Sequence, residues 1–141
     1  MGNTETYRRA HEAFNRRDWV AVTSNFSANS EYVDEARGVT LKGPDEFADY
    51  LRDNWLASFS DAQVTRPSYI DGGAAVVSQY LAAGTNDGPM GAMAATLKPM
   101  RLPMCEVMTF NPAGQITGGR LYYDQASVLV QLGHMEPPAS S

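Results

Sequence analysis

Apolar residues recur at intervals of three and four positions in three stretches of the N-terminal half, which is the spacing of one buried helix face. The first stretch follows Thr4, the second follows Asp18, and the third begins with Pro44. Thr and Asp favour the N-cap, and Pro favours the first helical position, so the pattern predicts three helices. Their buried positions are Tyr7, Ala10 and Phe14, then Trp19, Val22 and Phe26, then Phe47, Leu51, Trp55 and Phe59.

From Gln63 onwards apolar and polar residues alternate, as they do in strands with one buried face. Turn residues at 71–73 and 111–114 predict two hairpins. The segment 84–103 is rich in Gly and Pro, so we expect a long loop that covers a site. The predicted strands are 30–35, a short one within 38–43, 64–70, 74–83, 104–110 and 115–124, followed by a helix over 125–132.

Helices that precede a run of antiparallel strands indicate an α+β fold. We expect a strongly curved, mostly antiparallel sheet that wraps round the N-terminal helices into a cone, with a pocket on its concave face. The 141 residues suit one domain. We place this domain at residues 1–134 and expect a flexible Pro- and Ser-containing tail at 135–141.

Charge and composition narrow the classes of function. Hydrophobic residues make up 43% of the chain, enough to form a core, while the net charge of −5 and the pI near 4.9 argue against a nucleic-acid partner. The single Cys105 forms no internal disulfide, and neither a signal peptide nor a membrane span is evident, which favours the cytoplasm. His11 and His134 are expected at the surface, and no spacing of ligands indicates a metal or a nucleotide cofactor.

The charged residues of the last strand are the first candidates for chemistry. Because side chains alternate along a strand, Arg120 and Tyr122 face the pocket if Asp124 does. The hairpin places Glu106 opposite Arg120, where the two either form a structural ion pair or act in catalysis. Asp124 is either an acid or base in the pocket or the N-cap of the helix that begins at Gln125.

Further candidates lie on the early strand and the third helix. Tyr32 and Asp34 share one strand face, where Asp34 is either a second pocket carboxylate or a turn-forming residue. Trp55 belongs to the core or to the pocket wall. Met108, like the other methionines of the C-terminal half, either lines the pocket adaptably or fills gaps in the core.

One stretch also carries a family resemblance. Residues 118–124 read Gly-Gly-Arg-Leu-Tyr-Tyr-Asp and continue with Gln-Ala-Ser-Val-Leu-Val-Gln-Leu-Gly. This run resembles the C-terminal signature of SnoaL-like polyketide cyclases, which belong to the nuclear transport factor 2-like and ketosteroid isomerase-like group. The similarity extends from Asn15 through Tyr32-Val33-Asp34 and Leu41-Lys42-Gly43 to Gly133.

The resemblance implies that Asp124 is the acid or base of an intramolecular aldol condensation. The implied substrate is a polyketide-like or polycyclic small molecule of secondary metabolism. It also implies that the reaction needs no metal and no cofactor, and that the chain forms a homodimer or a higher homo-oligomer.

The chain departs from the family pattern at one position. Many members carry Gly-Thr-His before a Gly-Pro pair, whereas this chain reads Gly84-Thr85-Asn86-Asp87-Gly88-Pro89. Asn86 therefore stands at the histidine position, and Asn cannot shuttle a proton near neutral pH. It can donate a hydrogen bond to a substrate carbonyl, or it can serve as a turn residue.

Three hypotheses about function follow. The first is a cyclase or isomerase that transfers a proton at Asp124. The second is an epoxide-opening hydrolase in which Asp34, Arg120 and Asp124 arrange a water and protonate the oxygen. The third is a non-catalytic module that uses the cone for binding or dimerisation, which the Asn at position 86 favours.

Overall fold

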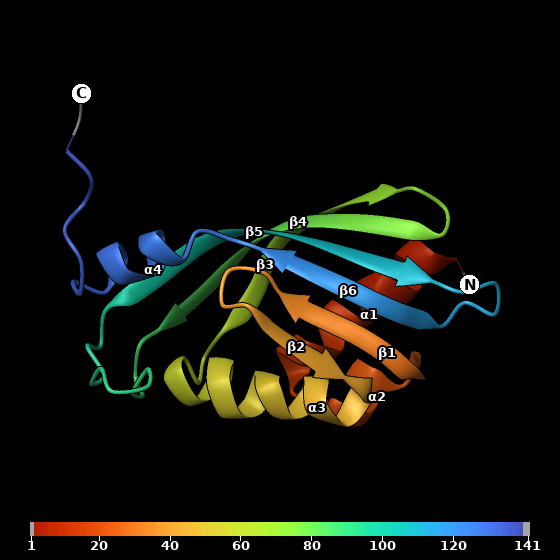
Figure 1. The fold of residues 1–141 in the computed structure, drawn as a ribbon, viewed down its shortest axis with the longest axis horizontal. Helices are drawn as coiled ribbons and strands as arrows, with labels where there is room; N and C mark the ends of the chain where they lie inside the picture. Colours follow the sequence, from red (N-terminus) through yellow and green to blue (C-terminus); the bar gives the residue numbers. More distant parts are fainter. Residues whose placement is uncertain (1, 140–141) are drawn as a thin grey trace.

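The computed structural model describes residues 2–139, in which a curved sheet of six strands packs against helices on its concave side (Figure 1). The helical elements are α1 (Asn3–Arg16), α2 (Trp19–Thr23), α3 (Gly43–Tyr50), the π-helix η1 (Leu51–Leu56) and α4 (Gln125–Gln131). The strands are β1 (Phe26–Asp34), β2 (Val39–Lys42), β3 (Gln63–Asp71), β4 (Ala75–Thr85), β5 (Pro99–Phe110) and β6 (Ile116–Tyr122). The predicted α+β class is confirmed.

The two N-terminal helices differ from the prediction at their ends. α1 begins after Gly2 and not at Thr4, so the predicted cap lies inside the first turn. Asp18 does cap α2, because its Oδ1 accepts a hydrogen bond of 3.2 Å from the backbone N–H of Ala21. Phe26 does not extend this helix, since it is the first residue of β1.

The third predicted helix is present and changes its winding midway. α3 opens with Pro44 in its first turn and passes directly into η1, where the turns widen. Tyr50 at the end of α3 and Trp55 in η1 are both buried, at 6% and 7% exposure. The continuous helical segment thereby presents two large aromatic side chains to the sheet.

The sheet has the order β2-β1-β6-β5-β4-β3. β1 and β6 are parallel, and every other neighbouring pair is antiparallel, so the sheet is mostly antiparallel as predicted. Even-numbered residues of β4 and β5 face the helices, and the strand alternation sends their neighbours to the outer face. The concave face is therefore built mainly by β5, the longest strand.

The predicted loop over 84–103 is shorter in the structure, because β4 continues to Thr85 and β5 begins at Pro99. A central strand seldom tolerates Pro103, since proline lacks the N–H that a ladder needs. Here β6 pairs only with residues 105–110, so this part of β5 has a strand on one side only. Gln131 of α4 covers the free side, and its side chain exchanges two hydrogen bonds with the backbone of Arg101.

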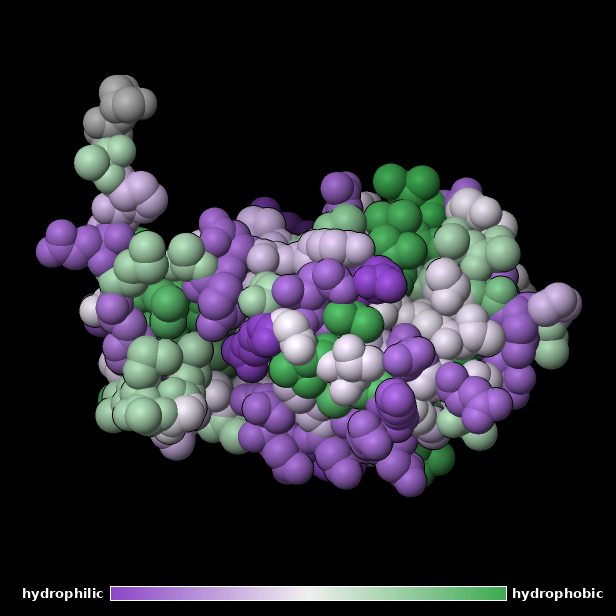
Figure 2. All heavy atoms as spheres, viewed as in Figure 1, coloured by the Kyte–Doolittle hydropathy of each residue, from purple (hydrophilic) through white to green (hydrophobic). Residues whose placement is uncertain are grey.

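The face drawn in Figure 2 mixes hydrophilic and hydrophobic residues, and strongly hydrophobic atoms gather over the β3–β4 hairpin, to which the 60% exposed Ile70 belongs. Residues 134–139 follow α4 and are exposed. Met1 and residues 140–141 of the predicted domain and tail lie outside the described residues. None of the helices within 2–139 has the length and hydrophobicity that crossing a membrane requires.

Candidate functional site

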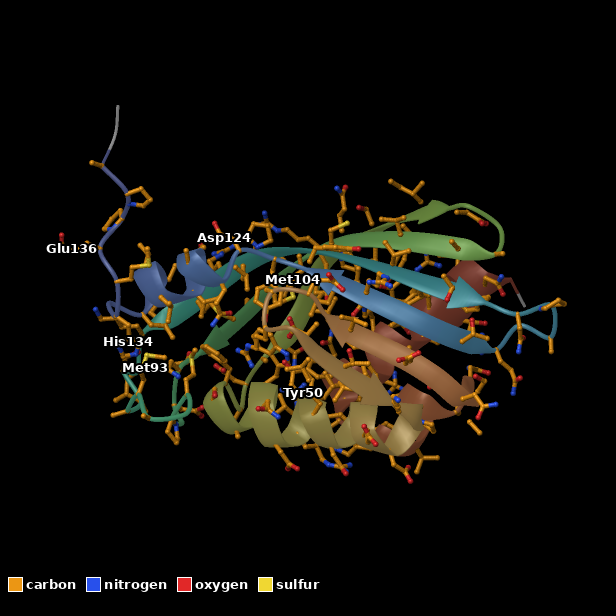
Figure 3. The ribbon with its side chains drawn as sticks, viewed as in Figure 1. Tyr50, Met93, Met104, Asp124, His134 and Glu136 are labelled. Carbon is orange, nitrogen blue, oxygen red and sulfur yellow. The ribbon has the colours of Figure 1, made fainter. Side chains whose placement is uncertain are left out.

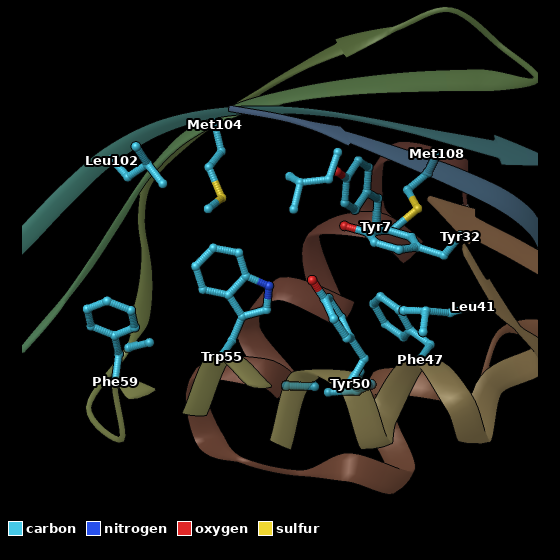
Figure 4. Close-up of a cluster of buried hydrophobic side chains, with 14 of the residues drawn as sticks. Tyr7, Tyr32, Leu41, Phe47, Tyr50, Trp55, Phe59, Leu102, Met104 and Met108 are labelled. Atoms are coloured by element: carbon cyan, nitrogen blue, oxygen red, sulfur yellow. The ribbon is translucent and has the colours of Figure 1, made fainter. Parts of the chain in front are cut away.

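A cavity of about 90 Å³ lies between the concave face of the sheet and the helices. Figure 4 shows Tyr50 and Trp55 pointing towards the sheet, with Met104 above Trp55 and Met108 beside Tyr7 and Tyr32. The walls of the cavity are mostly aromatic and sulfur-containing side chains. Those that matter most below are Tyr7, His11, Tyr32, Trp55, Tyr80 and Glu106.

Glu106 of β5 is the one carboxylate among the described residues that line this cavity, and it is only 5% exposed. Tyr7 of α1 donates a hydrogen bond to its Oε1, and Tyr32 of β1 donates one to its Oε2. The Nε2 atom of His11 lies 3.3 Å from Oε1. Three donors from two elements thus surround a carboxylate that the fold has removed from water.

The second ring nitrogen of His11 faces away from Glu106. Its Nδ1 lies 2.8 Å from the hydroxyl of Tyr69 on β3. An ionised carboxylate only accepts hydrogen bonds, so Nε2 carries the proton in the contact with Glu106. In the neutral imidazole Nδ1 then accepts from Tyr69, whereas in the charged form Nδ1 donates to it.

The protonation states follow from competing effects. Burial raises the pKa of Glu106, but the hydrogen bond and charge of His11 and the hydroxyls of Tyr32 and Tyr7 lower it, and the net pKa lies below the ordinary 4.5. Burial first, and the charge of Glu106 second, raise the pKa values of Tyr7, Tyr32 and Tyr80 well above 10. Near neutral pH the cavity therefore holds a charged carboxylate and protonated phenols.

Asp34 lies behind the cavity wall and is fully buried. Its Oδ2 accepts hydrogen bonds from Tyr50 at 2.7 Å and Tyr123 at 2.9 Å, and its Oδ1 accepts one of 3.1 Å from the backbone of Arg37. The guanidinium of Arg37 stacks 4.2 Å from the ring of Trp55. Both oxygens of Asp34 thus anchor the wall from outside, and we correct the prediction that it projects into the pocket.

The prediction that Glu106 opposes Arg120 is wrong by one residue. A β-bulge between Thr109 and Phe110 adds a residue to β6, so Glu106 faces Leu121 and Val107 faces Arg120. A shift of one residue turns every later side chain to the other face. Arg120 therefore points outward, where its guanidinium forms a 2.9 Å ion pair with Glu35.

The same shift places Tyr122 and Asp124 outside the cavity. Tyr122 is 44% exposed, and both residues line a broad groove of about 770 Å³ on the outer face. Asp124 is exposed and caps α4, its Oδ1 accepting from the backbone N–H groups of Ala126 and Ser127. Figure 3 shows Asp124 where β6 meets α4, with Tyr50 on the opposite side of the sheet. Of its two predicted interpretations, the structure has the helix cap.

Asn86 is 1% exposed and uses its whole amide on the neighbouring loop. Its Nδ2 donates to the carbonyls of Ser58 and Gly88, and its Oδ1 accepts from the backbone and hydroxyl of Thr96. These four contacts leave no donor for a substrate carbonyl, so the predicted binding role is corrected to a structural one. The residue at the family's histidine position here fastens the segment that follows it.

Four of the nine predicted site residues line this cavity. Tyr32, Trp55, Glu106 and Met108 line the cavity, while Asp34, Asn86, Arg120, Tyr122 and Asp124 do not. His11 is 8% exposed, so its expected surface position is wrong. His11 stands one helical turn after Tyr7 on the apolar stripe, and this spacing was the signal that could have found it. Within residues 2–139 no three His, Cys, Asp or Glu side chains gather as a metal site requires.

Comparisons with known proteins agree with this architecture. The family model described as SnoaL-like polyketide cyclase matches residues 4–132. None of the curated proteins compared with the chain matches it.

Solved structures match over nearly the whole chain. A protein assigned as a polyketide cyclase from Xanthomonas campestris has a TM-score of 0.82 at 25% identity, with 92% of this chain and 96% of that one covered. A protein of ketosteroid isomerase-like fold from Catenulispora acidiphila, solved in complex with trimethylamine, has a TM-score of 0.78 at 24% identity, with 92% of each chain covered. An NTF2-like protein from Burkholderia pseudomallei has a TM-score of 0.77 at 20% identity, with 92% and 96% covered. The predicted nuclear transport factor 2-like fold is confirmed.

Proposed function

Since the chain belongs to the SnoaL-like polyketide cyclase family, we propose that it is a cofactor-independent enzyme that transfers a proton on a small organic molecule in the interior cavity, with Glu106 as the base. The observation that carries the proposal is a buried, ionised carboxylate bordering an apolar cavity and surrounded by protonated donors. The hydrogen bonds that hold the pKa of Glu106 below its ordinary value also weaken it as a base, but a carboxylate of low basicity still serves in enolisation when donors stabilise the oxyanion that forms.

The donors around Glu106 supply that stabilisation. When Glu106 takes a proton from a carbon beside a carbonyl, the negative charge moves to the carbonyl oxygen of the substrate. Tyr7, Tyr32 and His11 lose their anionic acceptor in the same step and are free to donate to the new oxyanion. The proton then returns to another carbon in an isomerisation, or passes to the alkoxide that forms when the enolate carbon attacks a second carbonyl.

The size of the cavity limits the substrate. A cavity of ~150 Å³ lined by aliphatic and aromatic groups accommodates benzene, so the cavity of about 90 Å³ suits a short chain as it stands and must widen to take a ring. Met100, Met104 and Met108 line the cavity, and their flexible side chains can shift for a larger molecule. We propose that one ring of a polyketide-like substrate enters, with its carbonyl directed at the donors around Glu106.

Hydrogen exchange tests the proposal without knowledge of the product. The protein in D₂O is incubated with acetophenone, cyclohexenone and acetylacetone, and the loss of α-protons is followed by NMR. Glu106→Gln keeps the shape of the side chain and removes the base, and its exchange rate should fall by ~10²–10⁴. Thermal unfolding verifies that the variant is folded.

Asp124→Asn is the matched comparison, because Asn caps a helix as well as Asp does. Exchange should continue at the wild-type rate in this variant. Loss of exchange in Asp124→Asn with retention in Glu106→Gln would move the chemistry to the outer groove and overturn the proposal. The epoxide-opening arrangement has no such support, since Asp34 lies inside the fold while Arg120 and Asp124 lie outside it.

A second candidate function is the binding of a small organic cation. The cavity has aromatic walls and one carboxylate, and no Lys or Arg is among the described residues that line it. Aromatic faces attract quaternary and tertiary ammonium groups. The trimethylamine complex of the Catenulispora acidiphila protein supports this candidate as an analogy of fold.

Calorimetry separates the two candidates. Tetramethylammonium should bind to the wild type, and neutral neopentyl alcohol of similar shape should not. The affinity should fall at least about tenfold in Glu106→Gln, which corresponds to ~1.4 kcal/mol. Equal binding of cation and alcohol, or binding that survives the substitution, contradicts a cation site.

We also propose that two copies associate through the outer face of the sheet. Ile70, Val77 and Val107 lie opposite one another on three neighbouring strands of that face, and Val33 continues the row beyond Arg120. An apolar row of this kind is typical of a protein interface. Sedimentation velocity should give a dimer for the wild type and a monomer for Val107→Glu.

A further inference from the structure

Tyr69 connects the site to a part of the fold outside the cavity. It is not among the lining residues, yet its hydroxyl is the 2.8 Å partner of the Nδ1 of His11. Exposure increases along this chain of contacts, from 5% at Glu106 to 8% at His11 and to a half-buried Tyr69 on the edge strand β3. The imidazole thus lies between a buried carboxylate and a phenol near the surface.

The two partners of His11 determine its chemical form together. Glu106 requires a proton on Nε2, and a neutral ring then has a lone pair on Nδ1 that needs a donor. Burial raises the pKa of Tyr69 to about 12, although Arg8 opposes this shift, so its hydroxyl keeps its proton at neutral pH. A hydroxyl also rotates, so it can accept from Nδ1 when the ring is charged.

We propose that Tyr69 is a positioning residue that, through its contact with Nδ1, holds the ring of His11 with Nε2 directed at Glu106 and so sets the hydrogen bonding and reactivity of Glu106. This inference rests on the proposed role of Glu106 as the base. A second partner that fixes the tautomer of a catalytic histidine is a recurring arrangement in enzymes. Here the partner comes from a different strand than the carboxylate and does not touch the substrate cavity.

Every element packed against the pair of His11 and Tyr69 contributes charged or aromatic side chains to its surroundings. On α1, the ring of Tyr7 lies 4.7 Å from that of His11, and the guanidinium of Arg8 lies 5.0 Å from the ring of Tyr69. On β4, the ring of Tyr80 meets that of His11 edge to face at 4.9 Å. Glu106 itself comes from β5, and Glu5 and Glu12 of α1 add negative charge near Tyr69.

Nuclear magnetic resonance of the ligand-free protein tests the proposal. The chain has two histidines, so ¹⁵N-histidine labelling gives two sets of ring signals, and the His134→Gln variant assigns them. The wild type should show His11 with its proton on Nε2 and a hydrogen-bonded Nδ1. In Tyr69→Phe the ring is retained under Arg8 while the hydroxyl is lost, so the Nδ1 signal should shift because Nδ1 loses its hydrogen bond.

Tyr80→Phe is the matched control. It removes a hydroxyl from the same cluster, and within residues 2–139 this hydroxyl forms no hydrogen bond with His11. The tautomer of His11 should therefore be unchanged in this variant. Unchanged His11 signals in Tyr69→Phe, or equal shifts in the two variants, would overturn the proposal.

Hydrogen exchange gives a second measurement. The rate in Tyr69→Phe should fall roughly tenfold, less than the ~10²–10⁴ expected when the base itself is lost, and its pH profile should change shape. A shifted Nδ1 signal in Tyr69→Phe without exchange activity in the wild type contradicts the proposed function and leaves the positioning role of Tyr69 intact. Exchange in the wild type together with unchanged His11 signals in Tyr69→Phe supports the proposed function and overturns the positioning role of Tyr69.

Discussion

Ser78 lies opposite Glu106 in the ladder between β4 and β5 and is fully buried. Its hydroxyl has no hydrogen-bond partner among the described residues, in contrast to the three donors around Glu106. A buried polar group without a partner destabilises the folded state by about 1–3 kcal/mol. At the scale of single residues, the neighbour of Glu106 on β4 therefore carries a hydroxyl that the fold does not satisfy.

Replacing this hydroxyl should not weaken the fold. We expect Ser78→Ala to leave the free energy of unfolding unchanged or to raise it by about 1 kcal/mol, because the variant removes the unsatisfied group. Urea denaturation measures the difference. Ser58→Ala is the comparison, since the Ser58 hydroxyl donates to the carbonyl of Pro89 at 2.9 Å and its removal should cost about 1 kcal/mol. A clear loss of stability in Ser78→Ala would indicate that a buried water or ligand depends on the hydroxyl.

Residue patterns alone could predict part of the site. Tyr7 and Trp55 were expected on buried helix faces, and they are there because apolar spacing reports burial directly. The burial of His11 was not predicted, because histidine is a polar residue type. Only the folded structure shows that hydrogen-bond partners on both ring nitrogens offset the cost of burying it. The sequence could not decide between the two roles of Asp124, because a helix cap and a catalytic acid or base need the same residue in the same sequence position.

At the scale of elements, a single bulge decided which residues of β6 face the cavity. The sequence predicts the hairpin and its turn correctly, but one added residue has no periodic signal, and it reverses the facing of Arg120, Leu121 and Tyr122. The pair Gly118-Gly119 lies directly after the added residue. A side chain at Gly119 would bring its Cβ within 2.6 Å of the ring of Tyr32 and 2.7 Å of the sulfur of Met108.

Gly119→Ala should therefore disturb the donor on Glu106 as well as the strand. We expect a loss of stability of about 1–3 kcal/mol, the usual cost of overpacking a core, and a slower α-proton exchange because Tyr32 is displaced. Gly118→Ala is the matched control, since its closest contacts are 3.1 Å, to the carbonyl of Glu31 and the hydroxyl of Thr109. Equal effects of the two variants on exchange would show that Tyr32 has no special role.

At the scale of the whole molecule, the buried tyrosines and Glu106 determine how stability depends on pH. The pKa of Glu106 is lowered in the folded protein, so its contribution is present above about pH 4.5 and is lost as the pH falls through the folded value. The pKa values of Tyr7, Tyr32 and Tyr80 are raised, so the unfolded chain ionises first above pH 10. Stability should then decrease as the pH rises.

Chemical denaturation across pH 3 to 11 measures the decrease in the free energy of unfolding on both the acid and the alkaline side. Glu106→Gln should flatten the decline on the acid side, because the variant has no carboxylate whose proton uptake differs between the folded and unfolded states. The alkaline decline should begin near pH 10 in both proteins. If the free energy of unfolding falls as steeply with decreasing pH in the variant as in the wild type, carboxylates other than Glu106 cause the loss of stability in acid.

The parallel pairing of β1 with β6 also has a consequence for how the chain acquires its shape. Tyr32 aligns with Gly119, 87 positions later, and its hydroxyl reaches Glu106 only when β6 and β5 lie beside β1. Contacts between such distant segments carry a large loop-closure cost and slow the search for the native state. During synthesis, the carboxylate, its donors and the cavity assemble only after nearly the whole chain has left the ribosome.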